Sequence, residues 1–399
     1  MTARRSPAVT ALGSVVALQV GVSLPAFLVA TLAPYLEPDI GLTERSLGIA
    51  IASFHAVSSV SSVWLGRLAD RQTWQRGTQL AAASTLVPLV LLAGAVQSMP
   101  ALAIVLAATA LGHSLAVSTG NLAVFQAVPR ARQGLSFGVK QAAVPAAMML
   151  AGLSAPLVAE TLGWRAAFLL VIVFPVSAAV LSRVARSDLL LEGRPPDSPP
   201  PPPMRREERD RLKVLAAAIG LASFTASSTG AFFVLFAVHR GLTPAAAGIV
   251  VALCSGVNIV MRVFIGWLAD RRGADGIAWV SVLLLGGAVG YLVLTLADSQ
   301  ALVAFGAVLA YGMGWAWQGL VHLGAVRLVP DAPGYSSGVI RTGMSAGAGT
   351  GPVVSGLTIA YVGYTGLWAT QAVLSCVAAL AIFVTIRRMT PQVRTIEAA

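Results

Sequence analysis

The sequence predicts an all-α membrane protein of twelve transmembrane helices, arranged as two parallel six-helix repeats. Three observations predict this architecture: a high apolar content, a succession of long apolar runs, and an internal repeat. Of the 399 residues, 56% are hydrophobic and only 11% are charged, whereas a soluble domain carries about a quarter charged residues. Each apolar run is long enough to cross roughly 30 Å of hydrocarbon, which takes about 20 helical residues. We expect helices because lipid forces each segment to satisfy its own backbone hydrogen bonds.

Twelve apolar segments follow one another along the chain, six in each half. In the first half, they are predicted at residues 10–34, 44–66, 76–97, 99–127, 135–159 and 163–183. In the second half, they are predicted at residues 212–238, 244–268, 276–297, 300–328, 335–361 and 364–386. These segments define an N-terminal six-helix bundle at 1–183, a linker at 184–213 and a C-terminal six-helix bundle at 214–399.

The linker is rich in proline and in charge. Its proline run at 199–203 favours an extended, stiff chain. The charged run at 205–211 is either a solvated linker or a short helix on the membrane surface. Both readings place the linker outside the hydrocarbon layer.

The placement of arginine predicts how the chain is oriented. One set of loops carries Arg67, Arg71, Arg76, Arg130, Arg132, Arg271, Arg272 and Arg327. The opposite loops carry only Arg45, Arg165 and Arg240. Because cytoplasmic loops are enriched in Lys and Arg, we expect both termini and the linker in the cytoplasm. The protein is then a multi-pass protein of the inner (plasma) membrane, and its net charge of +11 reflects topology rather than nucleic-acid binding.

The two halves repeat at an offset of 200 positions. The string GLTERSLGI begins at Gly41 and GLTPAAAGI at Gly241, and WLGRLADR begins at Trp64 and FIGWLADR at Phe264 (241 − 41 and 264 − 64). The same offset relates Gly138 to Gly338 and Gly163 to Gly363. An even number of helices separates the copies, so both have the same orientation, which is a known plan of membrane transporters.

The repeated strings carry a recognisable motif after the second and eighth segments. Its residues are Gly66, Asp70 and Arg71 in the first copy, and Gly266, Asp270 and Arg271 in the second. This spacing resembles the signature of the major facilitator superfamily, and the resemblance covers nearly the whole chain. It implies a transporter that works by alternating access, in which the motif closes the cytoplasmic side. The alternative is that Asp70 and Arg71 only mark the membrane boundary.

Three basic residues lie deep inside predicted spans, away from the span ends: Lys140, Arg262 and Arg341. A basic residue at the centre of a span costs roughly 2.5–3.5 kcal/mol on insertion scales, and no Asp or Glu lies deep in a predicted span. An anionic substrate is the simplest counter-ion. Arg262, one helical turn after Asn258, offers a planar fork for a carboxylate. For Lys140, the alternative is that the side chain reaches the inner headgroups.

Further resemblances concern the substrate. The spacing of Asn258 and Arg262 resembles that in monocarboxylate and oxalate transporters of the superfamily. The stretch at 137–141, followed by Pro145, resembles the cyanate and nitroimidazole permease-like members. These resemblances imply a small organic anion of the carboxylate class, with a coupled proton or an exchanged anion. The remaining candidate site residues are His113, Gln19 and Trp315, of which His113 is either a proton carrier or a helix-packing donor.

The sequence contains no phosphate loop, metal-ligand cluster or nucleophile motif, so we expect neither an enzyme nor a cofactor. Two alternatives to an anion transporter stay open. One is an exporter of drug-like or neutral solutes, and the other is a membrane receptor that signals through the linker. We expect a monomer with a small-molecule anion and membrane lipid as its partners, and no nucleic acid. Cys254 and Cys376 lie in apolar runs and are expected to be free thiols.

Overall fold

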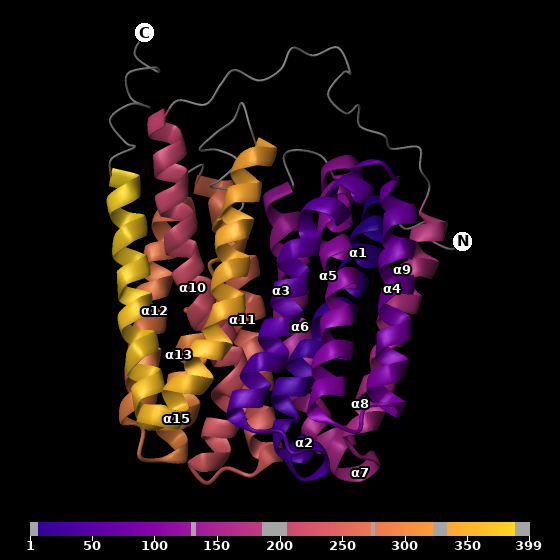
Figure 1. Ribbon diagram of the computed structural model, residues 1–399. Helices are drawn as coiled ribbons and strands as arrows, with labels where there is room; N and C mark the ends of the chain where they lie inside the picture. Colours follow the sequence, from indigo (N-terminus) through magenta and orange to yellow (C-terminus); the bar gives the residue numbers. More distant parts are fainter. Residues whose placement is uncertain (1–6, 129–132, 186–205, 273–275, 322–332, 388–399) are drawn as a thin grey trace, which may run out of the picture.

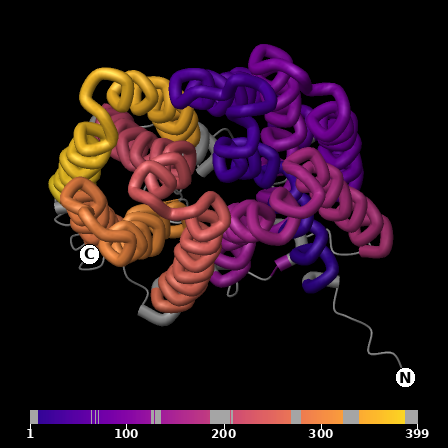
Figure 2. The backbone as a smooth tube through the Cα atoms, turned by 90° about the horizontal axis from the view of Figure 1, so that it is seen from below, coloured from indigo at the N-terminus to yellow at the C-terminus, as the bar shows by residue number. Residues whose placement is uncertain are grey.

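The computed structural model describes residues 7–128, 133–185, 206–272, 276–321 and 333–387. This part of the chain folds into helices with no strand, in two bundles that lie side by side (Figures 1 and 2). The first bundle contains α1 (Pro7–Thr31), α2 (Ala33–Ile40), α3 (Glu44–Asp70), α4 (Trp74–Gly94), α5 (Met99–Ala127), α6 (Gln133–Ser154), a π-helical turn (Ala155–Ala159), α7 (Glu160–Leu162), α8 (Trp164–Val171) and α9 (Val173–Val184). The second contains α10 (Arg206–His239), α11 (Pro244–Arg272), α12 (Gly276–Leu296), α13 (Gln300–Gly312) and α15 (Pro333–Arg387).

Membrane-spanning helices dominate both bundles. Nine helices of the described chain are long and apolar enough to cross a membrane. One of these stretches, Val339–Thr385, has 47 residues, enough for two crossings at about 20 residues each. Gly363 has non-helical angles of φ 74° and ψ −175° within α15, and it separates the predicted segments 335–361 and 364–386. The predicted segments 44–66 and 300–328 correspond to α3 and α13, which are not among the nine.

Four glycines confirm the internal repeat. Within the described residues, positive φ occurs at Gly41 (68°), Gly163 (81°), Gly241 (87°) and Gly363 (74°). These glycines form two pairs 200 positions apart (241 − 41 and 363 − 163). Side chains larger than hydrogen disfavour this backbone region, so the same tight turn is encoded at equivalent places in both halves. Both native cysteines are free thiols, as predicted.

The tenth predicted segment is interrupted. The sequence predicted a helix over 300–328, but α13 ends at Gly312 and residues 313–317 form turns. The chain approaches α12 closely here, because a Cβ atom on Gly287 would lie 2.4 Å from Cα of Gly314. Residues 322–328 lie outside the described part of the chain. The prediction was wrong in this segment because apolar composition does not reveal where side chains from another helix take over the backbone hydrogen bonds.

The two bundles meet along two seams, in which α6 packs on α11 and α3 packs on α15. We call the end of the molecule where α9 ends and α10 begins the upper end, and the opposite end, with α2 and α7, the lower end (Figure 1). At the lower end, glycines bring the backbones of the two bundles together. A Cβ atom on Gly48 would lie 2.6 Å from the Pro352 oxygen, and one on Gly152 would lie 2.4 Å from the Gly248 oxygen.

The linker of the sequence prediction is partly helical. α10 begins at Arg206, so the charged residues up to Lys213 continue directly into a spanning helix. There Lys213 forms an ion pair of 3.4 Å with Asp210 on the same helix. The proline run at 199–203 lies outside the described residues.

Candidate functional site

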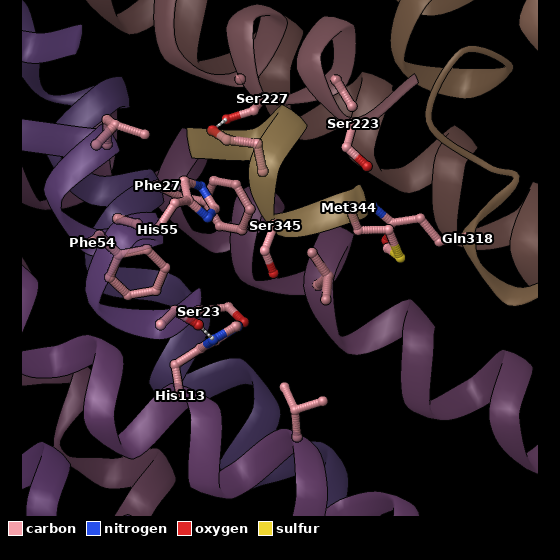
Figure 3. Close-up of a pocket in the computed structure, with 18 of the residues that line it drawn as sticks. Ser23, Phe27, Phe54, His55, His113, Ser223, Ser227, Gln318, Met344 and Ser345 are labelled. Carbon is pink, nitrogen blue, oxygen red and sulfur yellow. Dashed lines mark hydrogen bonds between the residues drawn. The ribbon is translucent and has the colours of Figure 1, made fainter. Parts of the chain in front are cut away.

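A cavity of about 210 Å³ lies between the two bundles. Helices α1, α3, α5 and α6 line it from one bundle, and α10, α15 and the chain after α13 line it from the other. Figure 3 shows side chains that converge on this space from both bundles: Ser23, Phe27, Phe54, His55, His113, Ser223, Ser227, Gln318, Met344 and Ser345. The site is therefore shared between the two halves of the repeat, as expected for a binding site at a repeat interface.

Positive charge is the main electrostatic feature of the cavity. Lys140 on α6 and Arg341 on α15 line it from opposite bundles. None of the described residues that line the cavity is Asp or Glu. The field of two cations in a site screened from water attracts an anion.

Lys140 is held at the cavity wall by α5. Its side chain is only 2% exposed, and Nζ donates a hydrogen bond of 3.2 Å to the Val117 oxygen and another to Oδ1 of Asn121. An ammonium group has three donors. The third has no partner among the described residues, so it is available to a ligand in the cavity.

Arg341 is held more loosely than Lys140. Its Nη2 donates to Oγ of Ser62 on α3 at 3.4 Å, near the long limit for a hydrogen bond. No other hydrogen bond joins this guanidinium to a described residue. A carboxylate in the cavity would therefore meet guanidinium donors that the described residues leave open.

Arg262 and Asn258 do not line the cavity. Arg262 is 3% exposed, and its Nε donates to Oδ1 of Asn258 at 2.7 Å. Its Nη1 donates to the Gln141 oxygen at 2.9 Å, and Nη2 donates to the Trp315 oxygen at 2.7 Å. Asn258 in turn donates to the Tyr311 oxygen. The fork that the sequence assigned to a substrate is thus occupied by protein acceptors in this conformation.

Gln19, His113 and Trp315 line the cavity together with Lys140 and Arg341. Gln19 donates to Oγ of Ser23 at 3.0 Å. The rings of Trp315 and Phe27 meet edge to face, with centroids 5.8 Å apart. Nε1 of Trp315 is buried and has no hydrogen-bond partner in the described part of the chain, so an acceptor on a ligand could pair with it.

Several lining residues were not singled out from the sequence. Phe54 packs against both His55 and His113, with ring centroids 5.2 Å apart in each pair. Ser58 lies 3.4 Å from Nδ1 of His113. Oγ of Ser223 is buried without a partner among the described residues. Serine and phenylalanine are common on helices of this kind, so no sequence signal marks which of them face the cavity.

The gating motif lies at the upper end of the molecule. A Cβ atom on Gly66 would lie 3.7 Å from Oγ of Ser118 on α5, so this glycine marks an ordinary contact within the first bundle. Arg71 is exposed and caps the C-terminus of α3, and Gly266 lies partly buried on α11. The side chains of Asp70, Asp270 and Arg271 lie outside the described set. The gating role of the motif stays a prediction.

Comparison with known proteins identifies the family. Residues 15–334 match the model of the Major Facilitator Superfamily. The chain belongs to this superfamily. The family and the fold indicate a multi-pass membrane transporter rather than an enzyme.

Similar proteins include one that is named an efflux pump and two solved structures of a bacterial transporter. An MFS-type efflux pump of Mycolicibacterium smegmatis is 26% identical over 270 residues, which cover 65% of this chain and 62% of the relative. The match thus spans less than two thirds of that pump. A bacterial homolog of the human lysosomal transporter Spinster, in an inward-facing, unoccupied conformation, aligns with a TM-score of 0.74 and 16% identity over 96% of this chain and 98% of its own. Its occupied, inward-facing conformation aligns with a TM-score of 0.70 and 15% identity, covering 94% and 96% of the two chains.

Proposed function

We propose that this transporter carries a small organic anion across the membrane by alternating access, and that the anionic group binds between Lys140 and Arg341. The observation that carries the proposal is a cavity with a cation from each bundle and no carboxylate among its described lining residues. Two cations that face each other across a site repel one another. An anion between them removes this repulsion, so a cation from each bundle contributes to holding the same ligand.

The rest of the cavity fits an anion with an apolar body. Phe27, Phe54 and Trp315 offer aromatic surface, which is the usual lining of small-molecule sites. Gln19 adds a polar contact, and so does Nε1 of Trp315, which has no partner among the described residues. A carboxylate attached to a ring or a short apolar chain meets all of these surfaces.

Three solutes of similar shape and different charge test the proposal. Benzoate, benzamide and benzylamine share a ring and carry a negative, a neutral and a positive group at neutral pH. We expect purified protein to bind and transport benzoate in proteoliposomes, with little uptake of the other two. Benzylamine transport at a rate equal to or above that of benzoate would contradict an anion site.

Export of drug-like or neutral solutes is the second candidate function. The relative named an efflux pump favours it, as does the aromatic lining of the cavity. In this case Lys140 and Arg341 would stabilise helix packing rather than bind substrate. Benzamide would then be carried at a rate similar to that of benzoate. Flux measured in vesicles of both orientations separates export from uptake.

Orientation and gating form part of the same proposal. The arginine bias supports a plasma-membrane protein whose upper end, linker and two termini face the cytoplasm. A cysteine at position 198, in a cysteine-free background, should then resist membrane-impermeant reagents added to intact cells. Labelling of this cysteine from outside would place the linker on the other side. We also propose that a proton or a second anion balances the transported charge.

A further inference from the structure

Four residues at the seams are related by the internal repeat. Ser62 on α3 and Arg262 on α11 are 200 positions apart (262 − 62), and so are Gln141 on α6 and Arg341 on α15 (341 − 141). Arg262 donates across one seam to Gln141, and Arg341 donates across the other to Ser62. The two bridges thus join equivalent positions of the repeat. In the α6–α11 seam the arginine is the repeat equivalent of Ser62, and in the α3–α15 seam it is the repeat equivalent of Gln141.

The Arg262 bridge fills hydrogen bonds that the backbone leaves open. In an α-helix the Gln141 oxygen would accept from residue 145, but Pro145 has no N–H. Nη1 of Arg262 donates to this oxygen at 2.9 Å. Nη2 donates at 2.7 Å to the Trp315 oxygen, in the turns that follow α13. The buried guanidinium of Arg262 therefore binds one carbonyl oxygen from each bundle. Without Arg262, both carbonyl oxygens would lose this hydrogen bond.

The Arg341 bridge has none of these supports. It is one hydrogen bond of 3.4 Å to a side-chain hydroxyl, and that hydroxyl already donates to the Ser58 oxygen within α3. Arg341 also lines the cavity, whereas Arg262 does not. A ligand can therefore compete with Ser62 for Arg341, but not with Gln141 for Arg262.

We propose that the two seams have different roles, with Arg262 holding the α6–α11 seam as a hinge and Arg341 closing the α3–α15 seam as a latch that the substrate anion releases. This inference rests on the proposed anion site for its release step. An anion that draws the guanidinium of Arg341 into the cavity breaks its bond to Ser62, because this bond is already 3.4 Å long. Binding at the cavity then loosens α3 from α15, while Arg262 keeps its contact with the Gln141 oxygen across the α6–α11 seam.

Distances across the two seams test the assignment. Spin labels at positions 68 and 346 report on the α3–α15 seam, and labels at 135 and 264 report on the α6–α11 seam; all four side chains are exposed. Both native cysteines are replaced by alanine. The variants are Ser62→Ala, Arg341→Gln and Arg262→Gln, with Ser61→Ala as the matched control, because Ser61 bonds only within its own bundle.

Without ligand, Ser62→Ala and Arg341→Gln should raise the open population at the α3–α15 seam roughly 2- to 10-fold, as expected for one lost hydrogen bond. The α6–α11 distances should stay unchanged in both, and Ser61→Ala should match the parent chain. Arg262→Gln should instead broaden the α6–α11 distances. Benzoate should shift the α3–α15 distances of the parent chain and have a smaller effect in Ser62→Ala.

Three results would overturn the assignment. An unchanged α3–α15 distribution in Ser62→Ala would exclude the latch whatever the substrate is. A benzoate shift that is equal at both seams would exclude the hinge. Benzoate binding measured on the same samples keeps the two proposals apart: loss of binding in Arg262→Gln, with unchanged seam distances, would return Arg262 to the anion site and remove its role as a hinge.

Discussion

Gly120 on α5 lies against the side chain of Lys140 on α6, so closely that a Cβ atom on the glycine would lie 3.0 Å from Cε of the lysine. The same Cβ atom would lie 2.9 Å from Cγ1 of Val15 on α1. Three helices thus meet around the stem of the one lysine in the cavity. The missing side chain at position 120 allows the ammonium group to reach Asn121 and the Val117 oxygen.

Gly120→Ala should weaken anion binding without removing any charge. The added methyl group meets Val15 on one side and the lysine stem on the other, so the stem must move away from its two acceptors. Overpacking of this kind typically costs about 1–3 kcal/mol, which is roughly 5- to 150-fold if all of it falls on binding. The measurement is benzoate affinity, with Gly94→Ala as control because a Cβ atom there meets nothing within 4 Å. Equal benzoate affinities in the two variants would show that anion binding does not depend on how Gly120 places the Lys140 side chain.

Lys140→Gln should abolish most anion binding. The chain contains only two lysines, Lys140 and Lys213, and Lys213 is exposed at the start of α10. Truncating one partner of a buried charge pair costs about 2–5 kcal/mol, or roughly 30-fold to several thousand-fold in affinity. Lys213→Gln makes the same change in net charge and should leave affinity unchanged. The measurement is benzoate binding by calorimetry, and a similar loss in both variants would point to a general effect of charge.

Much of the fold follows from the sequence. Apolar run length and the offset of 200 positions predicted two repeated helical bundles, and the paired turns at Gly41 and Gly241 confirm the repeat. The break after Gly312 could not be predicted. It depends on Asn258 and Arg262, which reach the carbonyls of that segment from another helix, and no local pattern encodes such contacts.

The site was harder to predict than the fold. The rarity of charge inside the spans marked Lys140, Arg262 and Arg341 as candidates. Sequence spacing places each residue on a helix but does not state which side faces the cavity. Only the packing of α6 on α11 turns Arg262 toward Gln141, while Arg341 lines the cavity. Resemblance to carboxylate transporters drew attention to Arg262, whereas the contacts favour Lys140 and Arg341 for the ligand.

Asp70→Asn should slow transport more than it weakens binding. The motif lies at the upper end of α3, far along the helix from the cavity, and its proposed role is to close that end in one state. Removing the charge alters the equilibrium between states rather than the contacts of the ligand. We therefore expect the transport rate at saturating benzoate to fall more than the equilibrium affinity for benzoate. A collapse of affinity with an unchanged maximal rate would contradict a gating role, and Asp298→Asn, in the loop between α12 and α13, serves as the control.

Gly48→Ala should favour the state in which the lower end is open. The added Cβ atom would lie 2.6 Å from the backbone oxygen of Pro352 on α15, and an oxygen fixed in a helix cannot turn away as a flexible side chain can. The clash exists only while α3 and α15 are in contact at this end. A cost of about 1–3 kcal/mol confined to that state shifts the equilibrium roughly 5- to 150-fold toward opening.

The opening at the lower end can be read from the reactivity of one cavity position. A cysteine at position 345, which lines the cavity, should react faster in Gly48→Ala with an impermeant maleimide added on the side of the lower end. Gly256→Ala is the matched control, since a Cβ atom there meets nothing within 4 Å. Reagent on the opposite side should react more slowly in Gly48→Ala than in the control. Faster labelling from both sides would instead indicate a loosened bundle, and unchanged rates would mean that α3 and α15 absorb the methyl group without separating.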